Sequence, residues 1–196
     1  MLTKIREIKN TISGDLPNIY LMHGDFMDEE INELYNHPKV KAHVSLTHGE
    51  GFGRPLLEAT LSEKPVMAPN WSGHVDFLKK PNAVLLGGAL ADVPKGSFPD
   101  NFHVDGMKWF TVNYQEASAT MKDIYKNYRK YTLPAKKLAM YNKSKFSLDE
   151  MTRQFGKILD KYVPEFAEEV KLELPKLNKV SETKAPEIKL PKLKKV

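Results

Sequence analysis

Apolar residues recur three or four positions apart in several stretches of the chain, which is the spacing of an amphipathic helix. Acidic residues fill the first turn of one stretch, and Pro38 ends it. Pro134 is expected to interrupt another stretch and to leave a second short helix behind it. The pattern predicts helices over residues 2–12, 27–37, 117–128 and 148–162.

The helix over residues 148–162 is the best marked. Ser147 and Glu150 have the spacing of a capping box, and Phe146 and Met151 are placed to close a hydrophobic staple. An apolar face that does not pack on its own sheet is a surface for a partner. The apolar face of this helix consists of Leu148, Met151, Phe155, Ile158, Leu159 and Tyr162.

Runs rich in strand-forming residues alternate with these helices. Residues 16–26 and 39–48 flank the acidic helix, and residues 65–68 and 82–88 follow. This order is typical of an α/β fold, and we expect a Rossmann-like parallel sheet flanked by helices. Residues 89–113 mix Gly, Pro and Asp without a clear period and are expected to form a long loop.

The stretch from Ser45 to Leu78 organises the rest of the chain. Glycines stand at positions 49, 51 and 53, and Pro55 then opens a helix, where its missing N–H has no partner to lose. A second glycine turn, Ser72–Gly73, follows the next predicted strand. A glycine-rich loop before a helix predicts an anion site, because free N–H groups and the helix dipole favour negative charge.

Two carboxylates flank this anion site, Glu50 in the loop and Glu58 one turn into the helix. Glu58 lies at the edge of the predicted buried stripe, beside Ser62, so it can face the carboxyl ends of the strands, where open α/β sheets bind ligands. The alternative, which the spacing alone favours, is that both are solvated surface groups.

The segment resembles the donor-binding C-terminal domain of GT-B glycosyltransferases, in the large retaining family called group 1. The family signature is two glutamates separated by seven residues, with a Gly-Phe-Gly turn between them and a Pro-Val strand behind. Here Glu50 and Glu58 enclose Gly51-Phe52-Gly53-Arg54-Pro55-Leu56-Leu57, and Lys64-Pro65-Val66 follows. The resemblance covers residues 18–162 and implies a single GT-B-type domain that serves sugar transfer with retention of configuration.

The resemblance also implies roles for individual residues. Glu50, as the candidate catalytic residue, orients the donor sugar with the Phe52–Gly53 backbone, and Glu58 hydrogen-bonds the ribose hydroxyls. The backbone of residues 51–55 holds the diphosphate, with Arg54 either assisting or remaining a surface residue. The candidate donor-binding residues are therefore His48, Gly51, Phe52, Gly53, Arg54, Pro55, Glu58, Ser72 and Gly73.

Other site types find less support. Gly49, Gly51 and Gly53 lack the G-x-G-x-x-G spacing of a dinucleotide fold or kinase loop. The sequence has no Asp-x-Asp pair and no histidines at metal-ligand spacing, so we expect neither a metal nor another cofactor. His74 adjoins the second glycine turn as His48 adjoins the first, and either imidazole is a candidate for a hydrogen bond to the sugar donor. Trp71 suits stacking on a base or sugar and packing at the rim equally well.

Composition narrows the function classes further. The formal net charge is +5, but basic and acidic residues are interspersed, so nucleic acid is not an expected partner and a basic patch for phosphorylated ligands explains the charge as well. The chain contains no cysteine, which excludes disulfides and thiolate metal sites. The first residues lack the apolar core of a signal peptide and no apolar run can span a bilayer, so we expect a cytoplasmic protein.

Domain organisation follows from a change in composition near Pro164. Residues 1–163 are expected to form the nucleotide-sugar-binding domain, and residues 164–196 a disordered tail rich in Lys and Pro. The run "LELPKLNKV" at 172–180 returns as "IKLPKLKKV" at 188–196. The repeat is either solvated sequence or a motif presented twice to a partner.

The sequence therefore predicts the donor-binding part of a hexosyltransferase-like, retaining glycosyltransferase, with a nucleotide sugar as substrate and an unidentified acceptor. Complete members of the family carry an acceptor domain for which this chain has no room. We accordingly expect a second polypeptide, or a second copy of the chain, to supply it. The alternatives are a non-catalytic nucleotide-sugar-binding adaptor that recruits partners through its tail, and a structural protein on the same fold.

Overall fold

A computed structural model describes residues 2–102 and 104–164 of the chain. Contacts divide the chain into two units, Met1–Phe155 and Gly156–Val196, so that the boundary falls within the last helix, α6 (Leu148–Tyr162). The strands of the described residues all lie in the first unit. The predicted disordered tail and its repeat lie outside the described residues, apart from Pro164.

The centre of the first unit is a three-stranded parallel sheet with the strand order β1-β2-β3. The strands are β1 (His43–Val44), β2 (Val66–Pro69) and β3 (Val84–Leu86). All four residues of β2 are buried, because this strand has a neighbour on each side and helices over both faces. The expected α/β class, with a parallel sheet flanked by helices, is confirmed.

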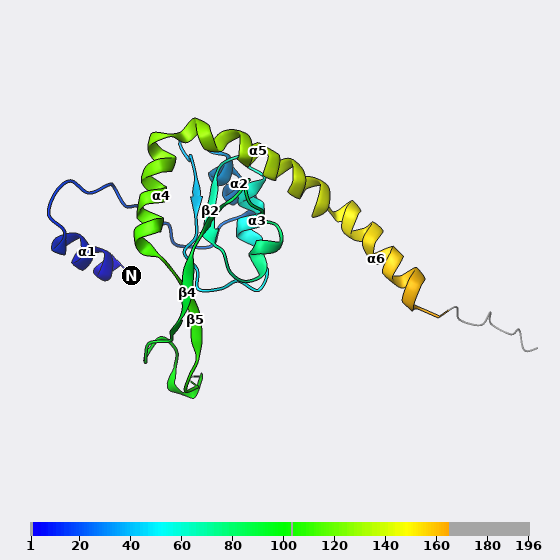
Figure 1. The fold of residues 1–196 in the computed structure, drawn as a ribbon. Helices are drawn as coiled ribbons and strands as arrows, with labels where there is room; N and C mark the ends of the chain where they lie inside the picture. Colours follow the sequence, from blue (N-terminus) through cyan, green and yellow to red (C-terminus); the bar gives the residue numbers. More distant parts are fainter. Residues whose placement is uncertain (1, 103, 165–196) are drawn as a thin grey trace, which may run out of the picture. The chain divides into compact units, whose positions relative to one another are not determined.

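Successive residues of β2 face opposite sides of the sheet and enter two different hydrophobic clusters. Val66 and Ala68 pack with Phe77 and with residues of α3 (Arg54–Thr60) and α5 (Tyr128–Lys145). Met67 packs on the other side, with residues of α4 (Tyr114–Lys126). Figure 1 shows α4 on one side of the sheet and α2 (Asp28–Asn36) and α3 on the other. The period of two in β2 thus builds both cores.

Helix α5 is continuous from Tyr128 to Lys145 and contains Pro134, so the predicted interruption at this proline is wrong. Pro134 lies in the second turn, where it removes one hydrogen bond to a preceding carbonyl. The buried stripe that follows offsets that loss: Ala135, Leu138, Ala139 and Asn142. The Asn142 side chain also donates to the Thr60 hydroxyl of α3 at 2.9 Å. The break between helices falls instead at Asn127, where α4 ends.

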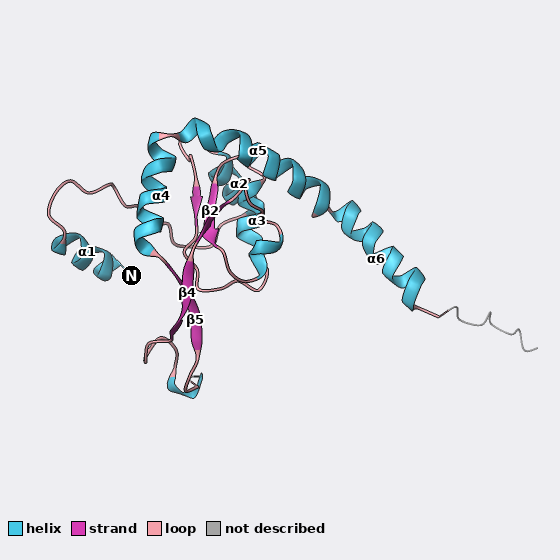
Figure 2. Ribbon diagram, viewed as in Figure 1, coloured by secondary structure: helices cyan, strands magenta, loops and turns pink. Residues whose placement is uncertain are grey.

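Residues 89–113 do not form the predicted long loop. Strands β4 (Gly88–Asp92) and β5 (Lys108–Val112) pair antiparallel, with Leu90 opposite Phe110. Figure 2 shows the two strands as a hairpin separate from the central sheet. Gly88 permits the pairing, because a Cβ there would lie 2.3 Å from the carbonyl oxygen of Thr111. A 3₁₀ turn, η2 (Asp100–Phe102), lies between the strands.

The predicted strand over residues 16–26 is also absent from the described structure. Its apolar residues remain exposed, Tyr20 by 84%. The neighbouring strand β1 is only two residues long and therefore offers little edge for pairing. The helix before this segment, α1 (Leu2–Thr11), and the helix after it, α2, are confirmed.

Helix α6 begins at one half of the predicted capping box. The Ser147 hydroxyl accepts from the backbone N–H of Glu150 at 3.2 Å, but the Glu150 carboxylate pairs with Arg153 at 2.6 Å instead of returning to Ser147. No residue of α6 is buried, and its predicted apolar face is exposed, from 41% at Leu159 to 80% at Leu148. None of the helices in the described part of the chain has the length and apolar character needed to cross a bilayer.

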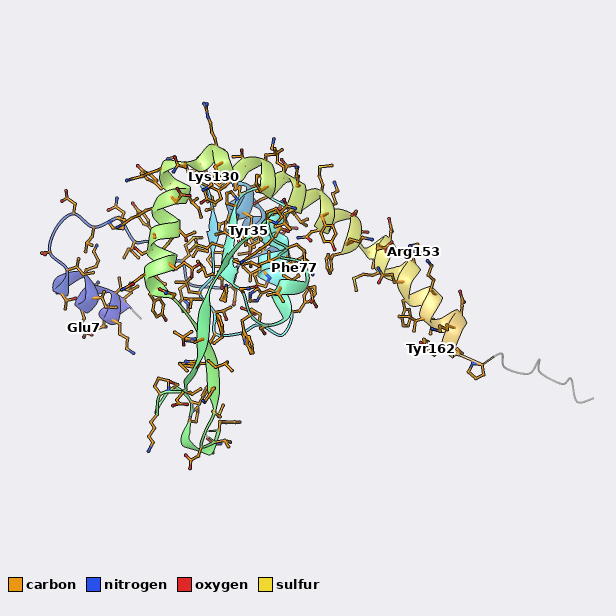
Figure 3. The ribbon with its side chains drawn as sticks, in the orientation of Figure 1. Glu7, Tyr35, Phe77, Lys130, Arg153 and Tyr162 are labelled. Atoms are coloured by element: carbon orange, nitrogen blue, oxygen red, sulfur yellow. The ribbon has the colours of Figure 1, made fainter. Side chains whose placement is uncertain are left out.

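A carboxylate fixes the junction between α4 and α5. Asp123 accepts hydrogen bonds from the Tyr131 hydroxyl, from Asn127 Nδ2 at 2.6 Å and from Lys130 Nζ at 3.1 Å. Figure 3 shows Lys130 at this junction, and Tyr35 and Phe77 among the packed side chains of the first unit. These hydrogen bonds, that from Tyr131 foremost, hold the pKa of Asp123 at about 2. The charged carboxylate therefore stabilises the fold.

We expect Asp123→Asn to lower the midpoint of thermal unfolding at neutral pH. Because the pKa of Asp123 is about 2 in the fold and 3.8 ordinarily, its charge stabilises the protein above pH 3.8, and this contribution is lost as the pH falls toward 2. The gap between the midpoints of wild type and variant should therefore close over that range in a series of melts. Asp160→Asn is the control, and a gap independent of pH would contradict the assignment.

Candidate functional site

The two glycine turns interlock at the carboxyl ends of β1 and β2. The Ser72 hydroxyl donates to the Glu50 carbonyl at 2.6 Å and accepts from the Glu50 N–H at 3.1 Å. The Gly73 N–H donates to the same carbonyl at 3.0 Å. A Cβ on Gly73 would lie 1.9 Å from the Gly51 carbonyl oxygen, so only glycine permits this approach. The predicted loop and the predicted turn thus form one backbone unit.

This unit leads directly into α3. Gly53 precedes the helix with φ of 86°, a left-handed conformation that favours glycine. Its carbonyl accepts from the N–H groups of Leu56 and Leu57 at 2.9 and 3.1 Å. The described residues provide no acceptor for the four N–H groups before them, which are those of Gly51, Phe52, Gly53 and Arg54. Of these four residues, Gly51, Phe52 and Arg54 are exposed and Gly53 is buried.

The Glu50 side chain lines a groove of about 360 Å³ between α2, β1 and α3. Glu50 is a half-buried residue, and its carboxylate makes no ion pair or hydrogen bond with the described residues. His43 lines the same groove, with Nε2 3.1 Å from the Ser62 hydroxyl. Burial, reinforced by Lys64, lowers the pKa of His43 and so keeps its imidazole neutral. The groove therefore contains one unpaired negative group beside an uncharged ring.

Glu58 lines a neighbouring groove of about 370 Å³ between α2 and α3, not the groove of Glu50. Its carboxylate pairs with Arg54 at 2.9 Å, and both side chains remain accessible to solvent. Tyr35 of α2 lines both grooves and separates them. Burial, and then the negative charge of Glu58, raises the pKa of Tyr35, so its phenol stays protonated as a hydrogen-bond donor. The two glutamates thus line two different grooves, and Tyr35 lines both.

His48 is held against the β4–β5 hairpin. Its Nδ1 lies 2.7 Å from the Phe110 carbonyl oxygen, and its carbonyl accepts from the Phe110 N–H at 3.3 Å. The imidazole also stacks on Trp109, with ring centroids 3.8 Å apart and an angle of 2° between the planes. Trp71 stacks on the Phe110 ring at 5.5 Å. The hairpin therefore contacts residues next to each of the two glycine turns.

His74 takes a different position. It is fully buried, and its Nε2 donates to the Pro69 carbonyl at 2.7 Å. Its Cβ lies 3.0 Å from the position a Cβ would take on Gly53, so the residue packs beneath the glycine loop. From the sequence, His74 and His48 were equally good candidates for a contact with the nucleotide sugar. The structure leaves only His48 accessible at this edge.

The structure brings His48, Glu50, Gly51, Gly53, Ser72 and Gly73 together at the carboxyl edge of the sheet. Pro55 lines the Glu50 groove, whereas Arg54 and Glu58 face α2. The Phe52 ring packs against Phe77 and Phe146 and leaves its backbone in the loop. Among the described residues, no three His, Asp or Glu side chains are grouped as metal ligands.

Sequence reasoning missed Tyr35 and Trp109. Tyr35 lies in the predicted helix over residues 27–37 but was given no role there, although the residue lines both grooves. Trp109 fell in the presumed loop, although residues 108–112, "KWFTV", carry strand-forming residues that could have revealed β5. In both cases the relevant neighbour is distant in sequence: Glu58 shares a groove with Tyr35, and His48 stacks on Trp109.

We expect Gly73→Ala to destabilise the fold by roughly 2–4 kcal/mol, because its Cβ would overlap the Gly51 carbonyl and force two backbone segments apart. Gly51→Ala is the matched control. No atom lies within 4 Å of a Cβ at that position, so the change should stay within about 0.5 kcal/mol. Urea unfolding measures both, and equal free energies of unfolding for the two variants would contradict the interlock.

Comparison with known proteins adds no assignment. No protein-family model matches the sequence, and a search of curated proteins finds no significant relative.

Proposed function

We propose that this chain is the donor-binding domain of a GT-B-type, Rossmann-like glycosyltransferase of the retaining group 1 class, hexosyltransferase-like in activity. Its substrate is a nucleotide-activated sugar, which it transfers to an acceptor. The observation that carries the proposal is the interlocked pair of glycine turns at the carboxyl edge of a parallel sheet, in a loop with an unpaired Glu50 carboxylate and four N–H groups that have no acceptor among the described residues. Open α/β sheets bind ligands at this edge.

The proposed roles follow the chemistry of each group. The N–H groups of residues 51–54 stabilise the diphosphate, whose charge increases as the glycosidic bond breaks. Glu50, half-buried and unpaired, accepts hydrogen bonds from hydroxyls of the donor sugar. Glu58 accepts hydrogen bonds from the ribose hydroxyls, while Arg54 screens its charge at 2.9 Å. Tyr35, protonated between the grooves, donates to the same ligand.

A thermal-shift screen over UDP-, GDP- and ADP-sugars tests the proposal directly. A ligand that binds only the folded protein stabilises it by about 2.7 kcal/mol at a hundred times its Kd. We expect one base to raise the midpoint of unfolding and the other two to have much smaller effects. If none of the three series shifts the midpoint at millimolar concentration, the donor-site proposal fails.

Glu58→Ala is expected to weaken binding of that nucleotide sugar by roughly 1–3 kcal/mol, since a charge-assisted hydrogen bond is lost. The Glu58 carboxylate is solvent-accessible, so the free energy of unfolding should change little. Glu63→Ala is the matched control, because Glu63 lies just beyond α3 and outside both grooves. Titration calorimetry measures both variants, and equal affinities would refute the role of Glu58.

We further propose that a second polypeptide, or a second copy of this chain, completes the catalytic site. Sugar transfer requires that the acceptor be aligned against the donor and that water be excluded. The exposed apolar face of α6, which includes Met151, Phe155 and Ile158, supports an association surface.

Light scattering and a sugar-transfer assay test the need for a second chain. We expect self-association at micromolar concentration, or turnover only when a partner is added. Binding without turnover under every condition would favour the adaptor alternative instead. A monomer that transfers sugar at about 1 s⁻¹ or faster would contradict the requirement for a second chain.

A further inference from the structure

The β4–β5 hairpin holds His48 through three contacts, which are two hydrogen bonds and one ring stack. The hydrogen bonds join His48 and Phe110 in both directions, through Nδ1 at 2.7 Å and through the backbone at 3.3 Å. The stack joins the imidazole to Trp109, with nearly parallel rings 3.8 Å apart. Together these contacts fix both the position of the ring and its rotation.

The hydrogen bond to Phe110 also selects the tautomer of His48. A carbonyl oxygen can only accept a hydrogen bond, so Nδ1 must carry the hydrogen. In the neutral imidazole, Nε2 then has a lone pair and acts as an acceptor. No described residue hydrogen-bonds Nε2, which points away from the Phe110 carbonyl because the two ring nitrogens diverge.

An acceptor at this position discriminates between parts of a nucleotide sugar. A phosphate oxygen is itself an acceptor, so it does not pair with the lone pair of a neutral imidazole. A sugar hydroxyl donates a hydrogen bond and does pair with it. The neighbouring N–H groups of residues 51–54 have the opposite preference and suit the phosphates. The loop that begins at His48 thus contains both an acceptor and a set of donors.

We propose that Nε2 of His48 accepts a hydrogen bond from a hydroxyl of the transferred sugar, and that Trp109 and Phe110 of the hairpin are the positioning residues that present it. The inference depends on the proposed donor site and adds to it a contact specific for the sugar. The hairpin then belongs to the ligand site, because it positions a residue that contacts the sugar. His48 recognises the donor by its glycosyl part, whereas the glycine loop recognises its diphosphate.

The tautomer can be tested without any ligand. Two-bond ¹H–¹⁵N correlation spectra distinguish a protonated from an unprotonated ring nitrogen, and comparison with His48→Phe identifies the signals of His48. We expect protonated Nδ1 and unprotonated Nε2 in the full chain. We expect Trp109→Ala to release the ring and to mix the two tautomers, and Trp109→Phe to restore one tautomer by restoring a stacking partner. Protonation at Nε2 in the wild type would overturn the inference.

The sugar contact is tested by comparing two ligands on the same variants. Calorimetry with a nucleotide sugar and with the matching nucleoside diphosphate isolates the contribution of the glycosyl group. We expect His48→Phe, which keeps a ring on Trp109 but removes Nε2, to lose about five- to tenfold in affinity for the nucleotide sugar. Affinity for the diphosphate should change less than twofold. Trp109→Ala should show the same selective loss, and Trp109→Phe should recover most of it.

The possible outcomes separate this inference from the proposed function. If the wild type binds neither ligand, both fail. If the wild type binds both, but His48→Phe loses the same factor for each or nothing for either, the donor site stands and the His48 contact is overturned. Unchanged diphosphate affinity also shows that each variant has kept its folded glycine loop.

Discussion

Two backbone segments meet at the carboxyl edge of the sheet with no room for a side-chain atom between them. Gly73 lies against the Gly51 carbonyl, and the Ser72 hydroxyl and the Gly73 N–H both bond to the Glu50 carbonyl. Ser72 adopts φ of 78°, an unfavourable value for a residue with a Cβ, and its two hydrogen bonds to Glu50 offset that strain. Because this contact fixes the loop, it also fixes the direction of the free N–H groups and the start of α3. The loop and the first turn of α3 therefore depend on a single close approach of two backbone segments.

Burial gives the grooves beside this contact a particular electrostatic character. The pKa of His43 is lowered and that of Tyr35 is raised, so both side chains are uncharged around neutral pH. The charges that remain are two carboxylates, of which Glu58 is paired and exposed while Glu50 is unpaired and half-buried. A ligand that supplies hydroxyl groups to Glu50 therefore gains more than one that supplies further negative charge. The N–H groups proposed to bind the diphosphate are uncharged donors of residues 51–54, in the loop that follows Glu50.

The sequence predicted what depends on short-range pattern. Two glycine turns, a helix opened by Pro55 and a parallel sheet were predicted from glycine spacing and from the alternation of strands and helices, whereas the contact between the two turns was not. The β4–β5 hairpin was missed because its stability comes from pairing across residues 93–107 and from stacking on His48. The predicted interruption at Pro134 was wrong because local propensity favours a break there, whereas the burial of Leu138 and its neighbours maintains the helix. Residues 16–26 have strand-forming composition but no adequate edge to pair with, since β1 is so short. The separation of Glu50 and Glu58 by Tyr35 likewise depends on how α2 packs, which no local pattern shows.

The hydrogen bond between His48 and Phe110 joins residues 62 positions apart. Closing a loop of that length costs more chain entropy than closing a short one. Contacts between residues so far apart therefore tend to form late in folding. The glycine turns, 22 positions apart at Glu50 and Ser72, can form before the hairpin is in place. The contact between the glycine turns therefore closes a much shorter loop than the contact that orients the imidazole. The His48 ring is held in place only once the strand that ends at Val112 has been synthesised and has paired.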